Sequence, residues 1–145
     1  MRDVVYLIQT DTTVGFISCD RDSLAKSKQR DPSQPFLICV DSFEKLKKIT
    51  RVPKRFKKKI RRAKKSTFIY PDKKAIRVVR DDRHSRFLKR FDFVYSTSAN
   101  KSKCSFELEY AVAHSDIVVE DNDGFYESDA SSIYEIGKSK IKKLR

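Results

Sequence analysis

Short apolar runs separated by polar segments make up most of the chain. Residues 4–8 (VVYLI) and 36–40 (FLICV) are continuous β-branched and apolar runs, which are typical of strands buried on both faces. Shorter or weaker runs of the same kind predict further strands at 66–70, 75–79, 93–97, 117–119, 131–136 and 140–144. These runs predict a sheet that is largely covered on its faces.

Amphipathic segments between these runs predict the helices that cover the sheet. We expect helices at residues 21–27, 42–49, 53–65, 84–91 and 105–114. Asp41 and Ser42 are good N-cap residues, and Glu44 follows Asp41 by three residues, as in a capping box. Because strands and helices alternate, we expect one α/β domain over residues 1–145, built on a mixed or parallel sheet.

The positive charge of the chain is confined to two segments. The net charge is +13, while residues 53–65 hold nine Lys and Arg residues and residues 138–145 hold five, with no acidic residue in either segment. The remainder of the chain is therefore close to neutral. Localised charge of this kind indicates a polyanionic partner.

The cysteines and histidines show no metal-binding spacing. Cys19, Cys39 and Cys104 are far apart and form no CxxC pair, and His84 and His114 do not complete a cluster with them. We therefore expect free thiols in a reducing compartment, a cytoplasmic location and no protein metal site. No apolar run reaches the length of a membrane span, so no membrane association is expected.

The chain lacks the glycine-rich loops that commonly bind nucleotides. It has only three glycines and contains neither GxxxxGK[ST] nor GxGxxG, which excludes a P-loop and a dinucleotide fingerprint. It contains no GxSxG or HExxH motif either. A nucleotide site in this chain would have to use separate cationic and hydroxyl side chains.

Short polar segments follow several of the predicted strands, where α/β sheets place ligand sites. They lie at residues 10–12, 28–30, 66–67, 80–84 and 98–100. Lys28 and Arg30 are two residues apart, so in extended backbone both would face one anion. Because one surface cation contributes only ~1–4 kcal/mol, binding a triphosphate requires several cations and hydroxyl groups together. We therefore expect these segments to converge on one basic hollow.

The order and spacing of these segments carry more information than any one of them. They read TDTTVG at 10–15, KQRDPSQPF at 28–36, STFI at 66–69, RDDRH at 80–84, STSANKS at 96–102, SSI at 131–133 and KLR at 143–145. This series resembles the YrdC-like family of threonylcarbamoyl-AMP synthases, whose motifs occur in the same order. The resemblance implies an α/β fold with a twisted open mixed sheet, helices packed on it and a concave basic face.

The resemblance also implies an activity. YrdC-like enzymes combine L-threonine, bicarbonate and ATP into L-threonylcarbamoyladenylate and pyrophosphate, a nucleotidyl transfer that uses Mg²⁺ with ATP. Their product supplies the tRNA threonylcarbamoyl transferase proteins that modify an adenosine of tRNA. By the family pattern, Lys28 and Arg30 are the catalytic residues. The implied substrate- and ATP-binding residues are Thr10, Thr12, Thr67, His84, Ser98, Asn100, Ser131 and Arg145.

The chain departs from the family pattern at several positions. Gln9 stands where the family usually has Pro, and Val14 stands where it usually has Tyr, which would remove an aromatic wall from the threonine pocket. The other departures are Lys64 and Lys65 for Pro-Gly, Asp82 for Pro and Lys103 for Gly. These changes leave open a divergent paralogue that keeps the fold and has altered chemistry.

The basic segment 53–65 allows two interpretations. Phe56, Ile60 and Ala63 form one narrow apolar stripe, so the segment fits a solvated amphipathic helix docked on the sheet. Nine cations without an acid also repel one another along a helix, and a bound polyanion would relieve that repulsion. RNA is the expected polyanion, contacted through its phosphates and shape. The expected contact residues are Lys54, Arg55, Lys57, Lys58, Arg61, Arg62 and Lys65.

Three functions therefore remain open from the sequence. The first is an ATP-dependent threonylcarbamoyladenylate synthase. The second is a non-catalytic module on the same fold that binds double-stranded RNA or tRNA through its basic face. The third is a regulatory or chaperone-like paralogue that binds nucleotide without chemistry.

Overall fold

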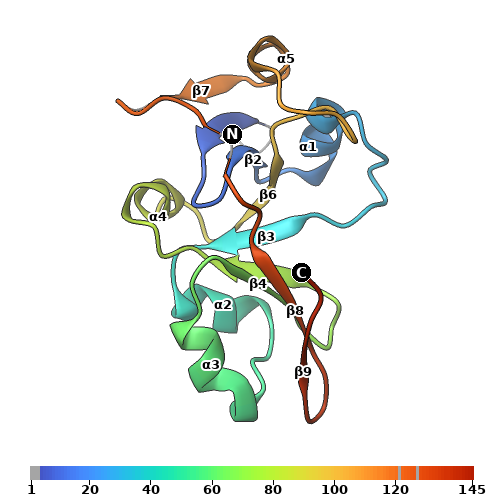
Figure 1. The fold of residues 1–145 in the computed structure, drawn as a ribbon, viewed down its shortest axis with the longest axis vertical. Coiled ribbons are helices and arrows are strands. Elements are labelled where there is room, and N and C mark those ends of the chain that lie inside the picture. Colours follow the sequence, from blue (N-terminus) through green and yellow to red (C-terminus); the bar gives the residue numbers. More distant parts are fainter. Residues whose placement is uncertain (1–3, 121, 127) are drawn as a thin grey trace. The chain divides into compact units, whose positions relative to one another are not determined.

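The computed structural model of the chain describes residues 4–120, 122–126 and 128–145. The chain divides into two compact parts, each built from strands and helices (Figure 1). The first part consists of Met1–Phe36 and Val94–Asp129, and the second part consists of Leu37–Phe93 and Ala130–Arg145.

In the first part, the described residues form a mixed sheet in the order β7-β1-β2-β6. Its strands are β1 (Tyr6–Gln9), β2 (Val14–Ser18), β6 (Val94–Ser98) and β7 (Ile117–Val119). Strand β2 is antiparallel to both β1 and β6, whereas β7 runs parallel to β1. Helix α1 (Arg21–Lys28) packs against β2 and β6, and helix α5 (Leu108–Ala113) precedes β7.

Strand β2 was not predicted from the sequence, which indicated only a polar segment at residues 10–12. That segment forms a short turn, in which the hydroxyl oxygen of Thr10 accepts hydrogen bonds from the backbone amides of Thr12 and Thr13. The chain then enters β2 directly at Val14. All five residues of β2 are buried, so the strand lacks the alternation of a half-exposed strand, and Gly15 and Ser18 also deprive it of a continuous apolar run.

Helix α1 brings Lys28 to the C-terminal end of β6. Asp20 caps the N-terminus by accepting a hydrogen bond from the amide of Ser23, and Leu24 is completely buried on the inner face. The helix ends at Gln29, which adopts a left-handed conformation with φ of 54°. Lys28 is therefore the last helical residue, and the expected extended backbone from Lys28 to Arg30 is wrong.

The second part also holds a mixed sheet, in the order β3-β5-β4-β8-β9 over its described residues. The strands are β3 (Leu37–Val40), β4 (Ser66–Ile69), β5 (Ala75–Val78), β8 (Ser132–Ile136) and β9 (Ile141–Lys143). The β3–β5 and β4–β8 pairs are parallel, and the β4–β5 and β8–β9 pairs are antiparallel. The helical elements are α2 (Phe43–Ile49), the 3₁₀-helix η1 (Lys54–Phe56), α3 (Lys57–Arg62) and α4 (Asp82–Leu88).

The predicted α/β class and mixed sheet are confirmed, while two details of the second part differ. Helix α3 ends at Arg62 instead of residue 65, because Ala63 is extended and Lys65 is left-handed with φ of 47°. At α2 the N-cap is Ser42, whose hydroxyl accepts from the amide of Lys45. Asp41 forms an ion pair with the Lys45 ammonium instead of a capping box.

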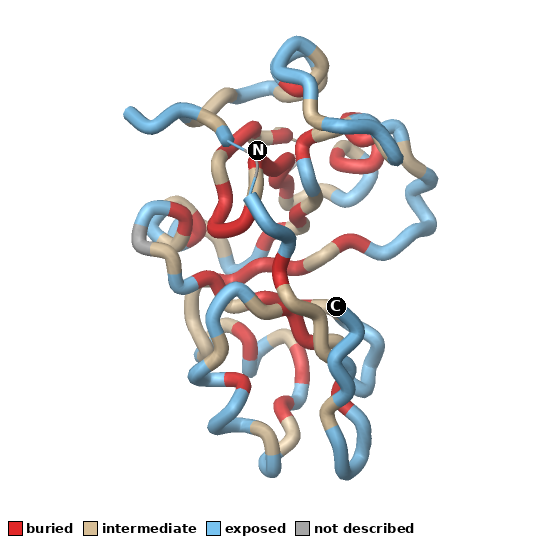
Figure 2. Tube along the Cα trace, viewed as in Figure 1, coloured by how far each residue is buried: buried red, intermediate tan, exposed pale blue. Residues whose placement is uncertain are grey.

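The first part has its own hydrophobic core, and buried residues follow its strands in Figure 2. The core cluster consists of Val5, Leu7, Val14, Phe16, Leu24, Ala25, Phe36, Ala99 and Ala111. By contrast, the loop at residues 31–35 is exposed along its whole length (Figure 2). The core therefore fixes both ends of this loop, at α1 and at Phe36, and leaves its middle in solvent.

We predict that replacing Lys103 by Gly stabilises the protein. Lys103 has φ of 68°, a left-handed conformation that costs a residue with a Cβ about 1–2 kcal/mol. Part of that gain is offset by the extra entropy that Gly has in the unfolded chain, so we expect Lys103→Gly to raise the free energy of unfolding by about 0.5–1 kcal/mol. Urea unfolding measures the change. Lys101→Gly in the same loop, where φ is negative, serves as the control and should be destabilising.

Candidate active site

The ammonium group of Lys28 is the centre of the candidate site. It donates hydrogen bonds to the Ser98 carbonyl oxygen at 2.9 Å, the Ser98 hydroxyl at 2.8 Å and the Asn100 side-chain oxygen at 2.9 Å. These residues come from the end of α1 and from the end of β6, 70 and 72 positions apart in the chain. The structure therefore brings together Lys28, Ser98 and Asn100, as expected from the sequence.

Two hydrogen bonds within its own loop fix the orientation of the Asn100 side-chain amide. The Asn100 nitrogen donates to the carbonyl oxygens of Lys101 at 2.9 Å and Cys104 at 2.6 Å. Both donors are used, so the amide oxygen is left to face Lys28. The same loop is tied to α1 by the amide of Ser102, which donates to the Lys28 carbonyl oxygen at 2.9 Å.

Tyr110 anchors the end of α1 from the other side. Its hydroxyl donates to the Ser27 carbonyl oxygen at 2.6 Å, which ties α5 to the residue before Lys28. Tyr110 was not among the site residues expected from the sequence. No motif could have revealed it, since Tyr110 is an ordinary inward-facing helix residue until α5 and α1 are placed side by side.

The electrostatic state of Lys28 favours an anionic ligand. The residue is 5% exposed, and the three acceptors around its ammonium group are all neutral. Over the described residues, Lys28 makes no ion pair with a carboxylate. Burial, and to a smaller extent the positive charge of Arg30, lower the pKa of Lys28 to about 8. A phosphate or carboxylate from outside would supply the missing negative charge.

Arg30 lies close enough to Lys28 to act on its charge, but its side chain is held differently. The guanidinium lies 4.1 Å from the centre of the Phe36 ring and donates from Nη2 to the Pro35 carbonyl oxygen. Its Nε is buried and has no hydrogen-bond partner in the part of the chain that the structure describes. Arg30 therefore keeps donor capacity at the rim of the exposed loop 31–35.

Thr10 and Thr12 lie on the same face of the first sheet as Ser98. Their hydroxyl oxygens are 3.3 Å apart, and both residues are buried. Gly15 links them to Ser98, because it stands opposite Ser98 in the β2–β6 ladder, and directly opposed residues share one face. A Cβ placed on Gly15 would lie only 2.8 Å from Thr10 Cγ2. The glycine therefore leaves the space that Thr10 occupies beside Ser98.

Two departures from the family pattern have structural explanations in the first part. The side-chain oxygen of Gln9 accepts a hydrogen bond from the amide of Tyr126 at 2.9 Å, so Gln9 ties residues 125–126 to β1. Val14 is 1% exposed and belongs to the core cluster. It therefore packs in the core as a small apolar residue.

A second cluster of expected site residues lies in the second part. The hydroxyl oxygens of Thr67 and Ser131 are 2.9 Å apart and buried. Arg145 Nε donates to the Ser131 carbonyl oxygen at 3.0 Å. The parallel pairing of β4 with β8 brings Thr67 and Ser131 together, and the β8–β9 hairpin returns Arg145 to the same place.

His84 is placed in the first turn of α4 and is 1% exposed. Its backbone amide donates to the carboxylate of the N-cap residue Asp81 at 3.0 Å. Neither ring nitrogen has a hydrogen-bond partner among the described residues. Burial, together with the positive charge of Arg77 and against the weaker effect of Asp81, lowers the pKa of His84 to about 4. The ring is therefore neutral at physiological pH.

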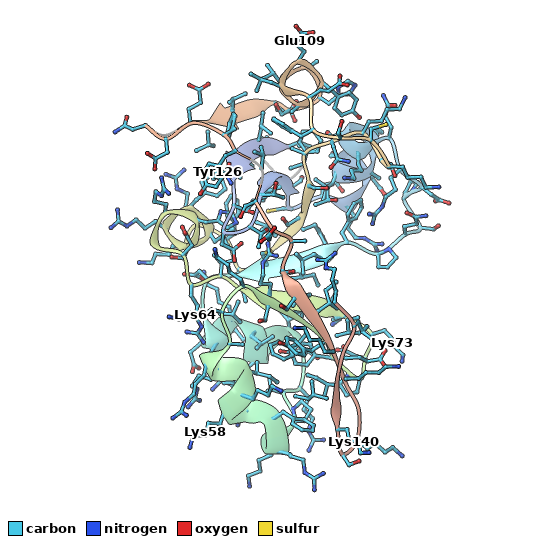
Figure 3. The ribbon with its side chains drawn as sticks, in the orientation of Figure 1. Lys58, Lys64, Lys73, Glu109, Tyr126 and Lys140 are labelled. Atoms are coloured by element: carbon cyan, nitrogen blue, oxygen red, sulfur yellow. The ribbon has the colours of Figure 1, made fainter. Side chains whose placement is uncertain are left out.

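The expected RNA-contacting cations all lie on the surface of the second part. Lys54 and Arg55 belong to η1, Lys57, Lys58, Arg61 and Arg62 belong to α3, and Lys65 follows α3. All seven are exposed. In Figure 3 the labelled side chains of Lys58 and Lys64 extend away from α3 into solvent. Arg61 already makes a cation–π contact within the protein, because its guanidinium lies 4.7 Å from the Phe43 ring centre.

The described residues also bear on metal binding and on membrane insertion. They hold no group of three or more His, Cys, Asp or Glu side chains that could bind a metal ion. None of the described helices combines the length and the apolar character that crossing a bilayer requires.

Comparison with known proteins identifies the family. The family model described as "Telomere recombination", which is that of the Sua5/YciO/YrdC domain, matches residues 3–145. The chain belongs to this family. The resemblance inferred from the motif order is therefore confirmed. No curated protein sequence matches the chain significantly.

Solved structures of the family share the fold. A variant of Sua5 from P. abyssi superposes with a TM-score of 0.82 at 16% identity, covering 99% of this chain and 52% of Sua5. A second P. abyssi Sua5 structure, complexed with L-threonine, gives a TM-score of 0.80 at 16% identity over 99% of this chain and 50% of that one. This chain therefore spans about half the length of Sua5.

Two further proteins show the same fold. The MTH1692 protein from Methanobacterium thermoautotrophicum gives a TM-score of 0.69 at 25% identity, covering 99% of this chain and 80% of that one. Full-length HypF in a phosphate- and nucleotide-bound form gives a TM-score of 0.79 at 15% identity, covering 99% of this chain and 27% of HypF.

We predict that burial of His84 makes the protein acid-sensitive. Because the folded pKa lies below the usual value, the unfolded state takes up the proton first as the pH falls below about 6.5. Stability is fully present at neutral pH and should fall by about 2 kcal/mol by about pH 5. Urea unfolding at both pH values measures this loss. His84→Leu should remove most of the pH dependence, whereas His114→Gln should retain it.

Proposed function

We propose that the chain is a nucleotidyltransferase that forms L-threonylcarbamoyladenylate from L-threonine, bicarbonate and ATP. Membership of the Sua5/YciO/YrdC family supports this reaction class. Among solved relatives, Sua5 has been crystallised with L-threonine and HypF with phosphate and nucleotide, so the fold accommodates ligands of both kinds. The observation that carries the proposal is the buried Lys28 ammonium, which is surrounded by neutral acceptors and lacks a carboxylate partner.

The proposed reaction needs positioning and charge more than a nucleophilic side chain. L-threonine and bicarbonate first give a carbamate with loss of water. A carbamate oxygen then forms a bond to the α-phosphorus of ATP, and the bond from that phosphorus to the bridging oxygen breaks, releasing pyrophosphate. Negative charge grows on the phosphate oxygens during this step, and fixed cations close to those oxygens lower the barrier.

Each residue of the first part has a defined role in this proposal. Lys28 would stabilise the phosphate charge, and a phosphate oxygen would replace one of its three neutral acceptors. Ser98 and Asn100 hold the ammonium in place until the ligand arrives. Arg30 would bind a second oxygen of the phosphates or the carbamate carboxylate with its remaining donors. Thr10 and Thr12 would bind the threonine end on the same sheet face.

The remaining assignments follow the family pattern. We expect Thr67, Ser131 and Arg145 to contact the nucleotide, since they form one cluster of hydroxyl and guanidinium groups in the second part. Magnesium would enter with ATP, bound to phosphate oxygens and water, because the described residues offer no carboxylate cluster for it. In this proposal the protein acts in the cytoplasm, and its product passes to the proteins that threonylcarbamoylate tRNA.

The proposal predicts pyrophosphate release that requires both L-threonine and bicarbonate. Lys28→Met keeps the aliphatic stem and removes the charge, so we expect kcat/KM to fall about 100-fold or more. Arg30→Ala should also lower the rate. The matched control is Lys26→Ala, which removes an exposed lysine from the same helix and should leave the rate unchanged. Activity that survives both Lys28→Met and Arg30→Ala, with the fold intact by thermal denaturation, would rule out this site.

The lowered pKa of Lys28 predicts weaker ATP binding in alkaline solution. Because only the ammonium form attracts phosphate, the apparent Kd for ATP should rise roughly tenfold between about pH 7 and about pH 9. A guanidinium stays charged over this range, so Lys28→Arg should remove most of the increase. Isothermal titration calorimetry at the two pH values measures the Kd for ATP of the wild type and of Lys28→Arg. If the Kd of the wild type and the Kd of Lys28→Arg rose equally with pH, a group other than Lys28 would be titrating.

A further inference from the structure

A turn with an unfavourable backbone conformation lies directly beside Lys28 in the first part. Residues 101–104 form this turn, which is closed by a hydrogen bond from the amide of Cys104 to the Lys101 carbonyl oxygen at 2.9 Å. Its third residue, Lys103, has φ of 68°. Turns with a positive φ at the third position favour Gly or Asn there, because a larger side chain is strained in the left-handed region. A lysine at this position therefore lowers the stability of the turn.

The turn has a structural role, and that role does not require a lysine. The Asn100 side-chain nitrogen donates to the carbonyl oxygens of Lys101 and Cys104, the two residues that close the turn. These bonds direct the Asn100 side-chain oxygen to the ammonium group of Lys28. Only backbone atoms of the turn take part, so Gly or Asn at position 103 would orient Asn100 equally well. Orientation of Asn100 therefore does not account for the side chain of Lys103.

The ammonium group of Lys103 is available to an external anion. The residue is exposed, and over the described residues it forms no ion pair with a carboxylate. A lysine carries its charge at the end of a flexible four-carbon stem with freely rotating donors, so the ammonium can adjust to a ligand. Its positive charge is therefore not committed within the described part of the protein.

A hydrogen bond joins the turn to the residue at the centre of the candidate site. The amide of Ser102, which precedes Lys103, donates to the Lys28 carbonyl oxygen at 2.9 Å. Lys28 itself is 5% exposed, whereas Lys103 lies on the surface. A ligand that reaches Lys28 from solvent and carries further phosphates must leave those phosphates among the exposed residues around it. Lys103 is one of these residues.

We propose that Lys103 binds the outer phosphates of a nucleoside triphosphate, which leave as pyrophosphate in the proposed reaction. The identity of this ligand rests on the proposed function. Lys28 would contact the reacting phosphate, and Lys103 would contact the β- and γ-phosphates beyond it. A buried, fixed ammonium suits the reacting phosphate, while an exposed, flexible one lets the leaving group depart. Because the family pattern has Gly at position 103, this contact would be a property of this chain.

The strain of the turn follows from this role. Residues held in unfavourable backbone conformations are concentrated at functional sites, where the side chain contributes to binding or catalysis. The stabilisation that we predict for Lys103→Gly would then come with weaker binding of the triphosphate, as expected where stability and function compete.

Isothermal titration calorimetry of the full chain with ATP, AMP and inorganic pyrophosphate, without L-threonine, tests the contact. Lys103→Asn removes the charge and introduces a residue that tolerates positive φ. We expect it to raise the Kd for ATP and the Kd for pyrophosphate about fivefold or more. The Kd for AMP should stay within about twofold of the wild type, because AMP has no outer phosphates. Lys103→Arg keeps the charge and should restore the Kd for ATP.

Two control variants each remove a different exposed lysine of the first part. Lys26→Asn changes the exposed side of α1, and Lys101→Asn changes the same turn at a residue without positive φ while keeping its backbone carbonyl. Both lower the net charge by as much as Lys103→Asn does, and both should leave the Kd for ATP within about twofold of the wild type. Thermal denaturation should show Lys103→Asn to be at least as stable as the wild type, so a damaged fold would not explain weaker binding.

Four results would overturn the inference. An unchanged Kd for ATP in Lys103→Asn would remove the contact, and equal losses for ATP and AMP would leave the lysine with a structural role alone. Equal losses in Lys101→Asn and Lys103→Asn would show that the charge of the turn as a whole attracts phosphate. A wild-type protein that fails to bind pyrophosphate would also contradict the contact.

The pyrophosphate-release assay judges the proposed function separately. Release that requires L-threonine and bicarbonate, together with an unchanged Kd for ATP in Lys103→Asn, would overturn the Lys103 contact and leave the enzymatic function in place. Loss of outer-phosphate binding in Lys103→Asn, in a protein that releases no pyrophosphate with either substrate, would overturn the function and leave the contact in place.

Discussion

The hydrogen bonds from the Lys28 ammonium to Ser98 and Asn100 are the interaction on which the candidate site depends. A buried ammonium group is costly unless its donors are satisfied, and here three neutral acceptors satisfy them without cancelling the charge. A carboxylate in their place would have neutralised the ammonium and left no charge for a ligand to neutralise. The arrangement therefore keeps a desolvated positive charge available in the folded protein.

The surrounding structure of the first part holds these few atoms in position. Helix α1 ends at Lys28 because Gln29 is left-handed, Tyr110 ties the last turn to α5, and Asn100 is oriented by the carbonyl oxygens of its own loop. Gly15 contributes by having no side chain, which lets Thr10 approach the face that carries Ser98. Preorganisation of this kind suits a reaction in which the protein supplies charge and geometry.

The positive charge of the chain is used in two different ways. In the first part, one lysine is buried and surrounded by neutral groups, so its effect is strong and local. In the second part, many exposed cations line or flank an open groove, so their effect is additive and screened by salt. The same residue types therefore act differently in the two parts, as one local charge and as an exposed, salt-screened surface.

Local patterns predicted much of the secondary structure, and the order of the motifs identified the family. The strands at residues 36–40 and 117–119 and the convergence of segments 28–30 and 98–100 were predicted from the sequence, whereas the hydrogen bonds from Lys28 to Ser98 and Asn100 were not. Strand β2 was missed because Gly15 and Ser18 leave it without a continuous apolar run, and the expected extended backbone at Lys28 was wrong because a helix ends there. The role of Tyr110 could not be predicted, since it depends on a contact between α5 and α1 that only packing brings about. Sequence by itself determined the elements and the chemical groups, because periodicity and residue type are local properties. Tertiary structure alone decided which of those groups face one another. Burial and hydrogen bonding join residues that are far apart in the sequence, so no single segment of the chain determines them.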